Sequence, residues 1–270
     1  MKTLGGSLII CDGEKYDYPF IEAIWSLLSV CDQVSVLCFS DYDERQIRHT
    51  FDTHKNMIIT RLARGDWDIP NRGKFRLSYF TNVVKSKLDT DWHLNLQGDE
   101  IIHESCHPAI REAMEWPMAE AFLIRRVNLW QDPYHVLKVP AERRPVADYV
   151  VRLARLGYDS VDDAENIQAP ARKEFCEKIR MYHMGFVRSR NVHNAKIINM
   201  QENIFGIPHD TRCDDDAREN KNAAGDAVFR PETRFSEDDL VPITEPLPYF
   251  IRNWAAARAY GGVDPFEVKS

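Results

Sequence analysis

Two adjacent carboxylates, Asp99 and Glu100, follow a segment over 92–97 in which large apolar and polar residues alternate. This alternation predicts a strand with one face in the core, so the carboxylates would lie just beyond its end. Hard oxygen ligands of this kind suit Mg²⁺ or Mn²⁺, and these ions in turn bind diphosphates. Acidic residues are also common in turns, so spacing alone leaves a metal site and a simple turn cap both open.

Three other acidic residues also follow apolar segments that are typical of strands. Asp12 comes after the segment 7–11, and Asp41 and Asp43 come after the segment 33–39. Ligands of open α/β sheets bind beyond the carboxyl ends of the strands. We therefore expect these carboxylates at the same edge of the sheet as Asp99, and this coincidence is the main physical argument for a site there.

A histidine and an aspartate later in the chain are further candidates for chemistry. His183 lies in the apolar segment 181–187 and is followed two residues later by a glycine. Its surroundings favour a hydrogen-bonded core histidine over a ligand. Asp163 belongs to the charged run 162–165, which is typical of a solvated face or a helix start. Its functional interpretation is that of a general base.

The elements that would position these residues alternate along the first hundred residues. Beyond the two segments above, strands are predicted over 57–62 and 92–96. Helical periodicity follows Pro19, a polar helix is predicted from Ser40 to His54, and apolar residues over 80–88 mark another helix. Repeated βα units predict an α/β fold with a Rossmann-like, mainly parallel sheet and flanking helices.

The second half of the sequence is less regular. Its predicted elements are strands over 119–128 and 179–187, helices over 148–156 and 254–260, and a polar, acidic loop over 213–233. We expect residues 1–212 to form the main domain and residues 213–270 to form a loop and helix extension packed on it.

Composition narrows the class of protein. The chain has 270 residues and a formal net charge of -7, which argues against a nonspecific nucleic-acid binder. It contains no apolar run long enough to span a bilayer and no signal-peptide pattern, so we expect a cytoplasmic protein without an integral membrane segment. The six cysteines form no C-x-x-C pair, which fits a reducing compartment and disfavours structural zinc.

Three segments, taken in order, resemble a known family. Residues 18–24, residues 92–104 and residues 182–188 are similar to motifs of the family 2-type glycosyltransferases of the GT-A superfamily, especially a bacterial and phage subgroup. The resemblance covers roughly residues 7 to 205. It implies that residues 1–212 form a GT-A nucleotide-sugar-binding and catalytic domain. The activity implied is metal-dependent transfer of a sugar from a nucleotide-diphosphate donor to an acceptor hydroxyl, with inversion.

The resemblance also assigns roles to the candidate residues. Asp99 takes the place of the metal-binding aspartate, with Mn²⁺ or Mg²⁺ as the ion, and His183 takes the place of the late histidine that completes the metal site. Glu100 would support the metal or meet the donor sugar. Asp163 would be the catalytic base, because it lies between the metal motif and the histidine.

The nucleotide-binding regions depart from the family pattern. The first strand is followed by Cys11-Asp12-Gly13-Glu14 instead of an arginine-asparagine pair, and the segment after the second strand lacks the usual threonine. The identity of the base is therefore open, with Asp12, Asp41 and Asp43 as candidates for hydrogen bonds to base or ribose.

Two other functions fit the same pattern. One is a nucleotidyltransferase, although a glycine-rich, basic phosphate loop is missing after the first strand. The other is a non-catalytic module that binds a nucleotide-sugar or a partner through the acidic loop around Asp214 to Asp216. For a transferase, the acceptor could be a glycan, a lipid-linked sugar, a protein or a modified nucleic-acid base.

Overall fold

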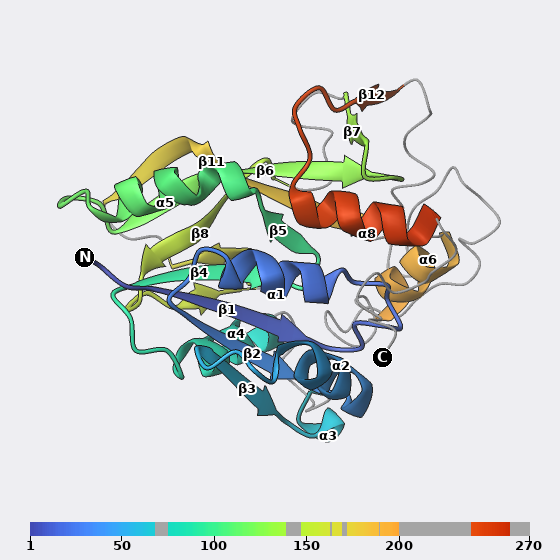
Figure 1. The fold of residues 1–270 in the computed structure, drawn as a ribbon, viewed down its shortest axis with the longest axis horizontal. Coiled ribbons are helices and arrows are strands. Elements are labelled where there is room, and N and C mark those ends of the chain that lie inside the picture. Colours follow the sequence, from blue (N-terminus) through green and yellow to red (C-terminus); the bar gives the residue numbers. More distant parts are fainter. Residues whose placement is uncertain are drawn as a thin grey trace, which may run out of the picture.

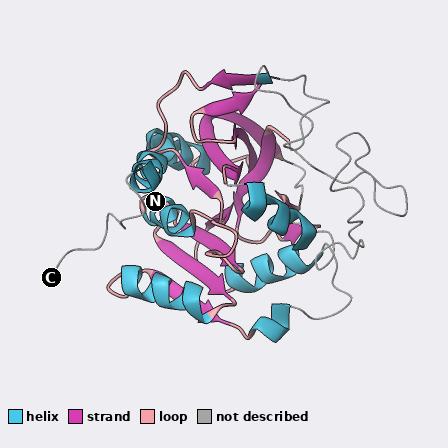
Figure 2. Cartoon of the chain, turned by 90° about the vertical axis from the view of Figure 1, so that its right-hand side faces the viewer, coloured by secondary structure: helices cyan, strands magenta, loops and turns pink. Residues whose placement is uncertain are grey.

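The structure is a computed structural model, and it describes residues 1–67, 75–138, 147–162, 164–168, 172–188, 190–199 and 239–259. The chain folds as an α/β protein around one large, curled sheet (Figure 1). This confirms the expected fold class. Helices cover both faces of the sheet (Figure 2).

The first half of the sheet is parallel. Four strands lie in the order β3-β2-β1-β4, with the bounds Leu4–Ile10 for β1, Gln33–Cys38 for β2, Met57–Arg61 for β3 and Trp92–Gln97 for β4. Leu8 of β1 pairs with Val36 on one side and Leu96 on the other, and all three side chains are buried. Strands covered on both faces are apolar along their whole length, which explains why the sequence predicted them.

Alternate residues of these strands pack under different helices. Leu8 and Val36 share the main core with α1 (Phe20–Leu28) and with Ile47 and Phe51 of α2 (Asp41–Phe51). Leu37 packs on the other face, against Phe80 and Val84 of α4 (Phe75–Lys85) and Trp67 of the short helix α3 (Arg64–Trp67). Ser40 caps α2 by accepting a hydrogen bond of 2.9 Å from the backbone N–H of Asp43.

The second half of the sheet is mostly antiparallel. Its path continues from β4 through β8, β6, β7 and β12, and β11 pairs with β6 and with β5. The bounds are Glu100–Ile102 for β5, Ala121–Trp130 for β6, His135–Leu137 for β7, Tyr149–Arg155 for β8, Lys173–Phe186 for β11 and Leu240–Pro242 for β12. A separate ribbon joins β9 (Ser160–Val161) to β10 (Asn166–Ile167).

Four further helical segments surround this half. They are η1 (Glu104–Cys106), α5 (His107–Met114), α6 (Arg190–Asn199) and α8 (Tyr249–Ala259). Ile251 and Trp254 of α8 are buried in the same core as α1. The expected boundary between residues 212 and 213 falls outside the described residues, so the division into domain and extension stays a prediction.

The segment 148–156, for which the sequence predicted a helix, is the strand β8. Leu153 pairs with Leu94 of β4 and with Phe122 of β6, so β8 is an interior strand with partners on both sides. Such a strand reads as a continuous apolar run, which periodicity alone does not separate from a buried helix. Its Arg152 is fully buried, and the partner that makes this possible is a carboxylate far away in sequence.

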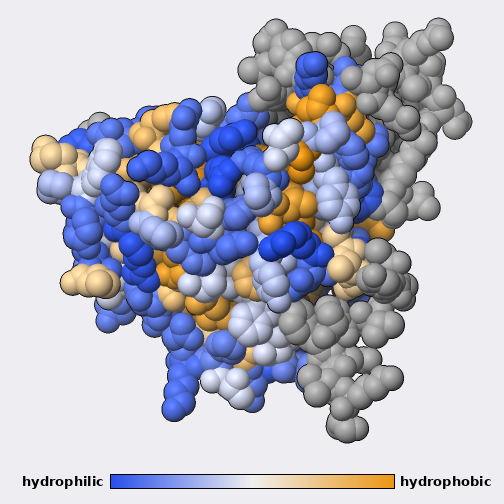
Figure 3. All heavy atoms as spheres, turned by 45° about the horizontal axis from the view of Figure 1, so that its top comes forward, coloured by the Kyte–Doolittle hydropathy of each residue, from blue (hydrophilic) through white to orange (hydrophobic). Residues whose placement is uncertain are grey.

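Hydrophilic residues cover most of the face shown in Figure 3, and patches of hydrophobic residues lie between them and at the outer edge. Within the ranges that the structure describes, none of the helices combines the length and the apolar character needed to cross a membrane.

Candidate active site

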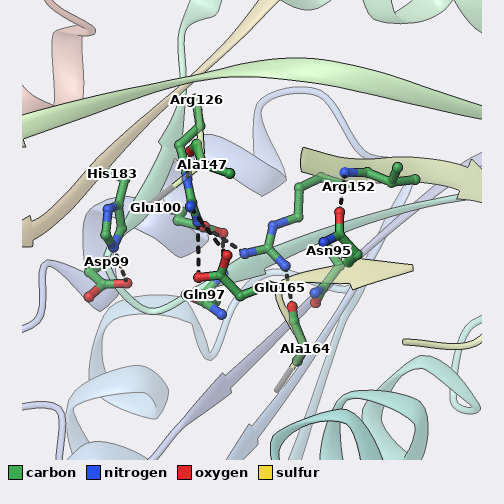
Figure 4. A network of polar contacts seen from close by, with 12 residues as sticks. Asn95, Gln97, Asp99, Glu100, Arg126, Ala147, Arg152, Ala164, Glu165 and His183 are labelled. Carbon is green, nitrogen blue, oxygen red and sulfur yellow. Dashed lines mark hydrogen bonds and ion pairs between the residues drawn. The ribbon is translucent and has the colours of Figure 1, made fainter. Parts of the chain in front are cut away.

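Asp99 lies in the turn between β4 and β5, beyond the carboxyl ends of the parallel strands. Its side chain is buried, and its backbone carbonyl accepts a hydrogen bond of 2.8 Å from the N–H of Met184 on β11. This hydrogen bond holds the segment around His183 against the turn. His183 Nε2 lies 3.9 Å from Asp99 Oδ1 (Figure 4). The structure therefore brings together the two residues that the family resemblance implied as metal ligands.

Gly185 allows the imidazole of His183 to fold back over the strand. A Cβ atom at position 185 would lie 2.3 Å from His183 Nε2, which is closer than any real contact. The glycine two residues after the histidine is thus a steric requirement of the ring position, because every other residue type would push the ring away from Asp99.

A hydrogen bond fixes which ring nitrogen of His183 faces Asp99. Nδ1 lies 3.0 Å from Asn128 Oδ1, and Asn128 Nδ2 donates to the Ala147 carbonyl at 3.4 Å, which leaves Oδ1 as the acceptor. Nδ1 therefore carries the proton and Nε2 presents its lone pair to Asp99. Burial lowers the pKa of His183 well below its ordinary value despite the nearby Asp99, so the ring is neutral at pH 7.

The other carboxylate oxygen of Asp99 contacts two cations. Lys196 Nζ of α6 lies 2.9 Å from Oδ2 and Arg188 Nη2 lies 3.3 Å from it. Burial on its own would raise the pKa of Asp99, but Lys196, His183 and Arg188 together hold it below the ordinary value. Asp99 is therefore ionised over the whole physiological range.

Arg188 and Lys196 both lie over the ring of Tyr18, at 4.9 Å and 5.0 Å from its centroid. Arg188 also donates to the carbonyls of Tyr16 at 2.7 Å and Met184 at 3.1 Å. The guanidinium thus joins the loop before α1 to the end of β11 and to Asp99. The three segments that carried the family resemblance meet at this point.

The arrangement of Asp99 and His183 fits a divalent cation. Two electron-pair donors, a carboxylate oxygen and an imidazole nitrogen, face each other across 3.9 Å, a distance too long for a hydrogen bond. Among the described residues, no group of three or more His, Cys, Asp or Glu side chains is placed to hold a metal ion. Asp99 and His183 are thus a pair of candidate ligands, and a carboxylate oxygen with an imidazole nitrogen is a donor set that would accept Mg²⁺ or Mn²⁺.

Glu100 lies in a different environment from its neighbour. It is completely buried, and its carboxylate accepts hydrogen bonds from Arg152 Nη2 at 2.7 Å and from the Gln97 backbone N–H at 2.8 Å, with Arg126 Nη1 at 3.9 Å (Figure 4). These contacts enclose both of its oxygens. They favour an electrostatic role inside the protein over the expected contact with metal or donor sugar.

The same two arginines hold the turn that follows β9. Arg126 donates to both oxygens of Glu165 at 3.2 Å, and Arg152 donates to the carbonyl of Ala164. The backbone on either side of position 163 is unusual, with φ of 52° at Asp162 and 63° at Ala164. Non-glycine residues adopt such values at a cost, and several contacts must hold them there. Asp163 itself, the expected base, lies outside the described residues.

The three aspartates expected near a nucleotide differ in exposure. Asp43 is fully buried, and its Oδ2 accepts a hydrogen bond of 3.1 Å from the Gly13 backbone N–H, so it anchors the loop after β1. Burial raises the pKa of Asp43. Asp12 has a φ of 56° and pairs with Arg64 at 3.2 Å. The side chain of Asp41 is 80% exposed and pairs with Arg61.

The sequence did not identify three residues of this site, which are Asn128, Arg188 and Lys196. Arg188 lies in the third motif, and its charge at the end of an apolar strand is a signal that could have identified it as a site residue. Asn128 and Lys196 carry no such signal, because each is an ordinary polar residue in its segment. Only the pairing of β6 with β11, which sets His183 opposite Asn128, places the asparagine beside the ring.

No model of a known protein family matches this sequence, and no curated protein does either. Solved structures with a similar fold include TarS from S. aureus, at 14% identity and a TM-score of 0.45 over 80% of this chain and 42% of that chain. A TarS fragment of residues 1–349 in complex with UDP matches at 14% identity and a TM-score of 0.45, covering 80% of this chain and 69% of that chain. The 4-diphosphocytidyl-2C-methyl-D-erythritol synthase of Anaerococcus prevotii matches at 12% identity and a TM-score of 0.37, over 57% of this chain and 70% of that chain. Similarities at this level assign neither a reaction nor a ligand.

Proposed function

We propose that this chain is a metal-dependent glycosyltransferase that moves a sugar from a nucleotide-diphosphate donor to an acceptor hydroxyl. The observation that carries the proposal is the pair formed by Asp99 Oδ1 and the neutral His183 Nε2, which face each other across 3.9 Å beyond the carboxyl ends of parallel strands. A pair of this kind would hold a divalent cation, and such an ion would supply positive charge to the diphosphate of a donor. The ordered sequence motifs at residues 18–24, 92–104 and 182–188 support the same conclusion.

Asp99 and His183 would hold Mn²⁺ or Mg²⁺ at the donor site. When bound, such an ion offsets the negative charge that develops on the leaving diphosphate. Arg188 contributes a fixed positive charge beside it, because two backbone carbonyls and Asp99 hold its guanidinium in place. Asn128 keeps the imidazole of His183 in the tautomer that can act as a ligand.

The proposed base is Asp163, which would remove the proton of the acceptor hydroxyl as that oxygen attacks the anomeric carbon. General base catalysis of this kind contributes roughly 10²–10⁴ in rate. The residues next to Asp163 support this role. Arg126 donates to Glu165 and Arg152 donates to Ala164, and Arg152 also donates to the buried Glu100. A single displacement by a fixed acceptor inverts the anomeric configuration. Glu100 would act through these arginines on the position of the base.

The acceptor would be bound outside the donor site. A cavity of about 800 Å³ is lined by Arg126 and Asn128, which both contact the site, and by Trp130 and Tyr149. Aromatic and polar side chains together suit a sugar ring, which offers an apolar face and hydroxyl edges. We propose a glycan acceptor for this cavity; a protein and a modified nucleic-acid base are the alternatives that offer the same hydroxyl chemistry. For the nucleotide, Asp12 is the best placed of the three aspartates, because it follows β1, the strand beside β4, and its carboxylate, unlike that of Asp43, is not fully buried.

A screen of nucleotide-sugars tests the proposal. The melting temperature of the protein should rise with one of the UDP-, GDP-, CDP- or TDP-sugars, and only when Mn²⁺ or Mg²⁺ is present, because a ligand that binds the folded state stabilises it. Asp99→Ala should abolish this shift and turnover, whereas Asp89→Ala, at an exposed position, should retain both.

Two outcomes would point to other functions. Pyrophosphate release from a nucleoside triphosphate and a sugar phosphate would identify a nucleotidyltransferase. Binding of a nucleotide-sugar without any hydrolysis or transfer of the sugar, with every metal and acceptor class, would identify a non-catalytic binding module.

A further inference from the structure

Lys196 stands out among the residues around Asp99, because it contacts the carboxylate where a ligand of the site would otherwise approach. Its Nζ lies 2.9 Å from Asp99 Oδ2, and its side chain is only 13% exposed. It comes from α6, which lies at the end of the molecule toward which β1 and β2 run (Figure 1). The lysine therefore reaches into the site from an element outside the sheet.

The two cations on Asp99 are held very differently. Arg188 donates to two backbone carbonyls as well as to Asp99, and its side chain is fully buried. For Lys196, the contacts within the described part of the chain are Asp99 and the face of the Tyr18 ring. Lysine is a compact charge on a flexible stem of four carbons. Lys196 can therefore leave the carboxylate by rotating its side chain, while Arg188 cannot.

The charges at the site do not balance with a metal ion alone. Asp99 carries one negative charge, and Arg188 and Lys196 beside it carry one positive charge each, so the described side chains around this carboxylate already have an excess of positive charge. A divalent cation added to it would be repelled by the ammonium beside the same carboxylate. A diphosphate, with a negative charge on each phosphate, would offset the two charges of the metal ion and would attract the ammonium.

We propose that Lys196 is an exchangeable counter-ion, which neutralises Asp99 in the donor-free protein and moves to the diphosphate of the donor when a divalent cation takes the carboxylate. This inference rests on the proposed function and deepens it. Lys196 then competes with the divalent cation and cooperates with the diphosphate. Removing its charge must change the two affinities in opposite directions, which no purely structural role would do.

Lys196→Met tests the exchange, because methionine keeps much of the aliphatic stem and removes the charge. By isothermal titration, Mn²⁺ alone should bind the variant about fivefold or more tighter than the wild type, since a like charge near the carboxylate is gone. With saturating Mn²⁺, a nucleoside diphosphate should bind about tenfold or more weakly, since a charge-assisted hydrogen bond to phosphate is lost. Lys87→Met, at an exposed position after α4, should change neither affinity.

The outcomes separate this inference from the proposed function. If the wild type binds a nucleoside diphosphate with Mn²⁺ but Lys196→Met lowers both affinities, or leaves the Mn²⁺ affinity unchanged, the exchange is wrong and the proposed function stands. If the wild type binds neither ligand, both are wrong. Lys196→Gln, which keeps a hydrogen-bond donor without the charge, should reproduce the opposite shifts and provides a second folded variant, since Arg188 still pairs with Asp99 in it.

Discussion

Asn128 Oδ1 lies 3.0 Å from His183 Nδ1, and this one contact decides that the unprotonated Nε2 faces Asp99. The two residues come from neighbouring strands, β6 and β11, where they sit directly opposite each other in the parallel register. A ligand histidine needs its other nitrogen occupied in this way, because the tautomer and the ring angle would otherwise be free to change. The proposed metal site therefore depends on a residue that touches no metal.

Asn128→Leu should weaken Mn²⁺ binding about 10- to 100-fold, the usual effect of losing the partner of a ligand histidine. The leucine fills a similar volume but accepts no hydrogen bond, so Nε2 is no longer the fixed lone-pair donor. Titration with Mn²⁺ in the presence of a nucleoside diphosphate measures the change. Asn128→Asp retains an acceptor oxygen at the same place and should bind Mn²⁺ as well as the wild type. Equal Mn²⁺ affinity in the wild type and Asn128→Leu would show that His183 is not a ligand.

Glu100→Gln should lower the free energy of unfolding by about 3 to 5 kcal/mol, because it leaves the buried guanidinium of Arg152 without its counter-ion. Urea unfolding at pH 7 measures the change. Glu112→Gln is the matched control, since its carboxylate is 66% exposed and pairs with Lys178 only at 4.0 Å, and it should change stability by less than about 0.5 kcal/mol. A Glu100→Gln protein of wild-type stability that has lost turnover would instead favour the direct role at the metal or the donor sugar that the resemblance implies.

The sequence predicted the parallel half of the fold well. The apolar runs of β1 and β2 and the alternating residues of β4 each end at a polar turn. It also predicted that Asp99 lies just beyond the end of β4, at the edge of the sheet. The sequence did not reveal which side chains surround Asp99. Asp99 and Glu100 are neighbours with the same chemistry, yet one faces His183 and Lys196 while the other is enclosed by Arg126 and Arg152.

The error over β8 has the same origin. An arginine within an apolar segment is rarely the mark of an interior strand, because a buried charge is costly unless it is paired. The partner of Arg152, Glu100, is 52 residues away along the chain, and only the pairing of β8 with β4 brings the two together. Local patterns carry information about neighbours along the chain, whereas buried ion pairs depend on contacts across the sheet.

A buried histidine away from the site should make the protein sensitive to acid. Burial lowers the pKa of His93 from 6.5 to about 3, with Lys85 adding to the effect, while Ser7 Oγ lies 2.7 Å from its Nε2. Below pH 6.5 the unfolded chain takes up a proton that the folded chain excludes. The contribution of His93 to stability is therefore full above pH 6.5 and is lost as the pH falls toward 3, at up to about 1.4 kcal/mol for each pH unit.

Urea unfolding at pH 7.5, 6.5 and 5.5 measures this dependence. His93→Gln, which keeps a hydrogen-bonding group near Ser7 but cannot titrate, should lower stability at pH 7.5 and make its decrease toward pH 5.5 shallower. A slope between pH 6.5 and 5.5 that is the same in the wild type and the variant would show that His93 is not protonated on unfolding.

Asp163→Asn should keep the binding of the donor and lose the transfer of its sugar. The amide cannot accept the proton of the acceptor hydroxyl, so turnover should fall by roughly 10²–10⁴. The affinity for the nucleotide-sugar with Mn²⁺ should stay unchanged, since Asp99 and His183 are intact. Asp162→Asn is the matched control, because asparagine tolerates the φ of 52° found at that position, and it should transfer sugar at the wild-type rate. Normal turnover in Asp163→Asn would remove this residue from the mechanism, and loss of turnover in Asp162→Asn alone would move the role of base to its neighbour.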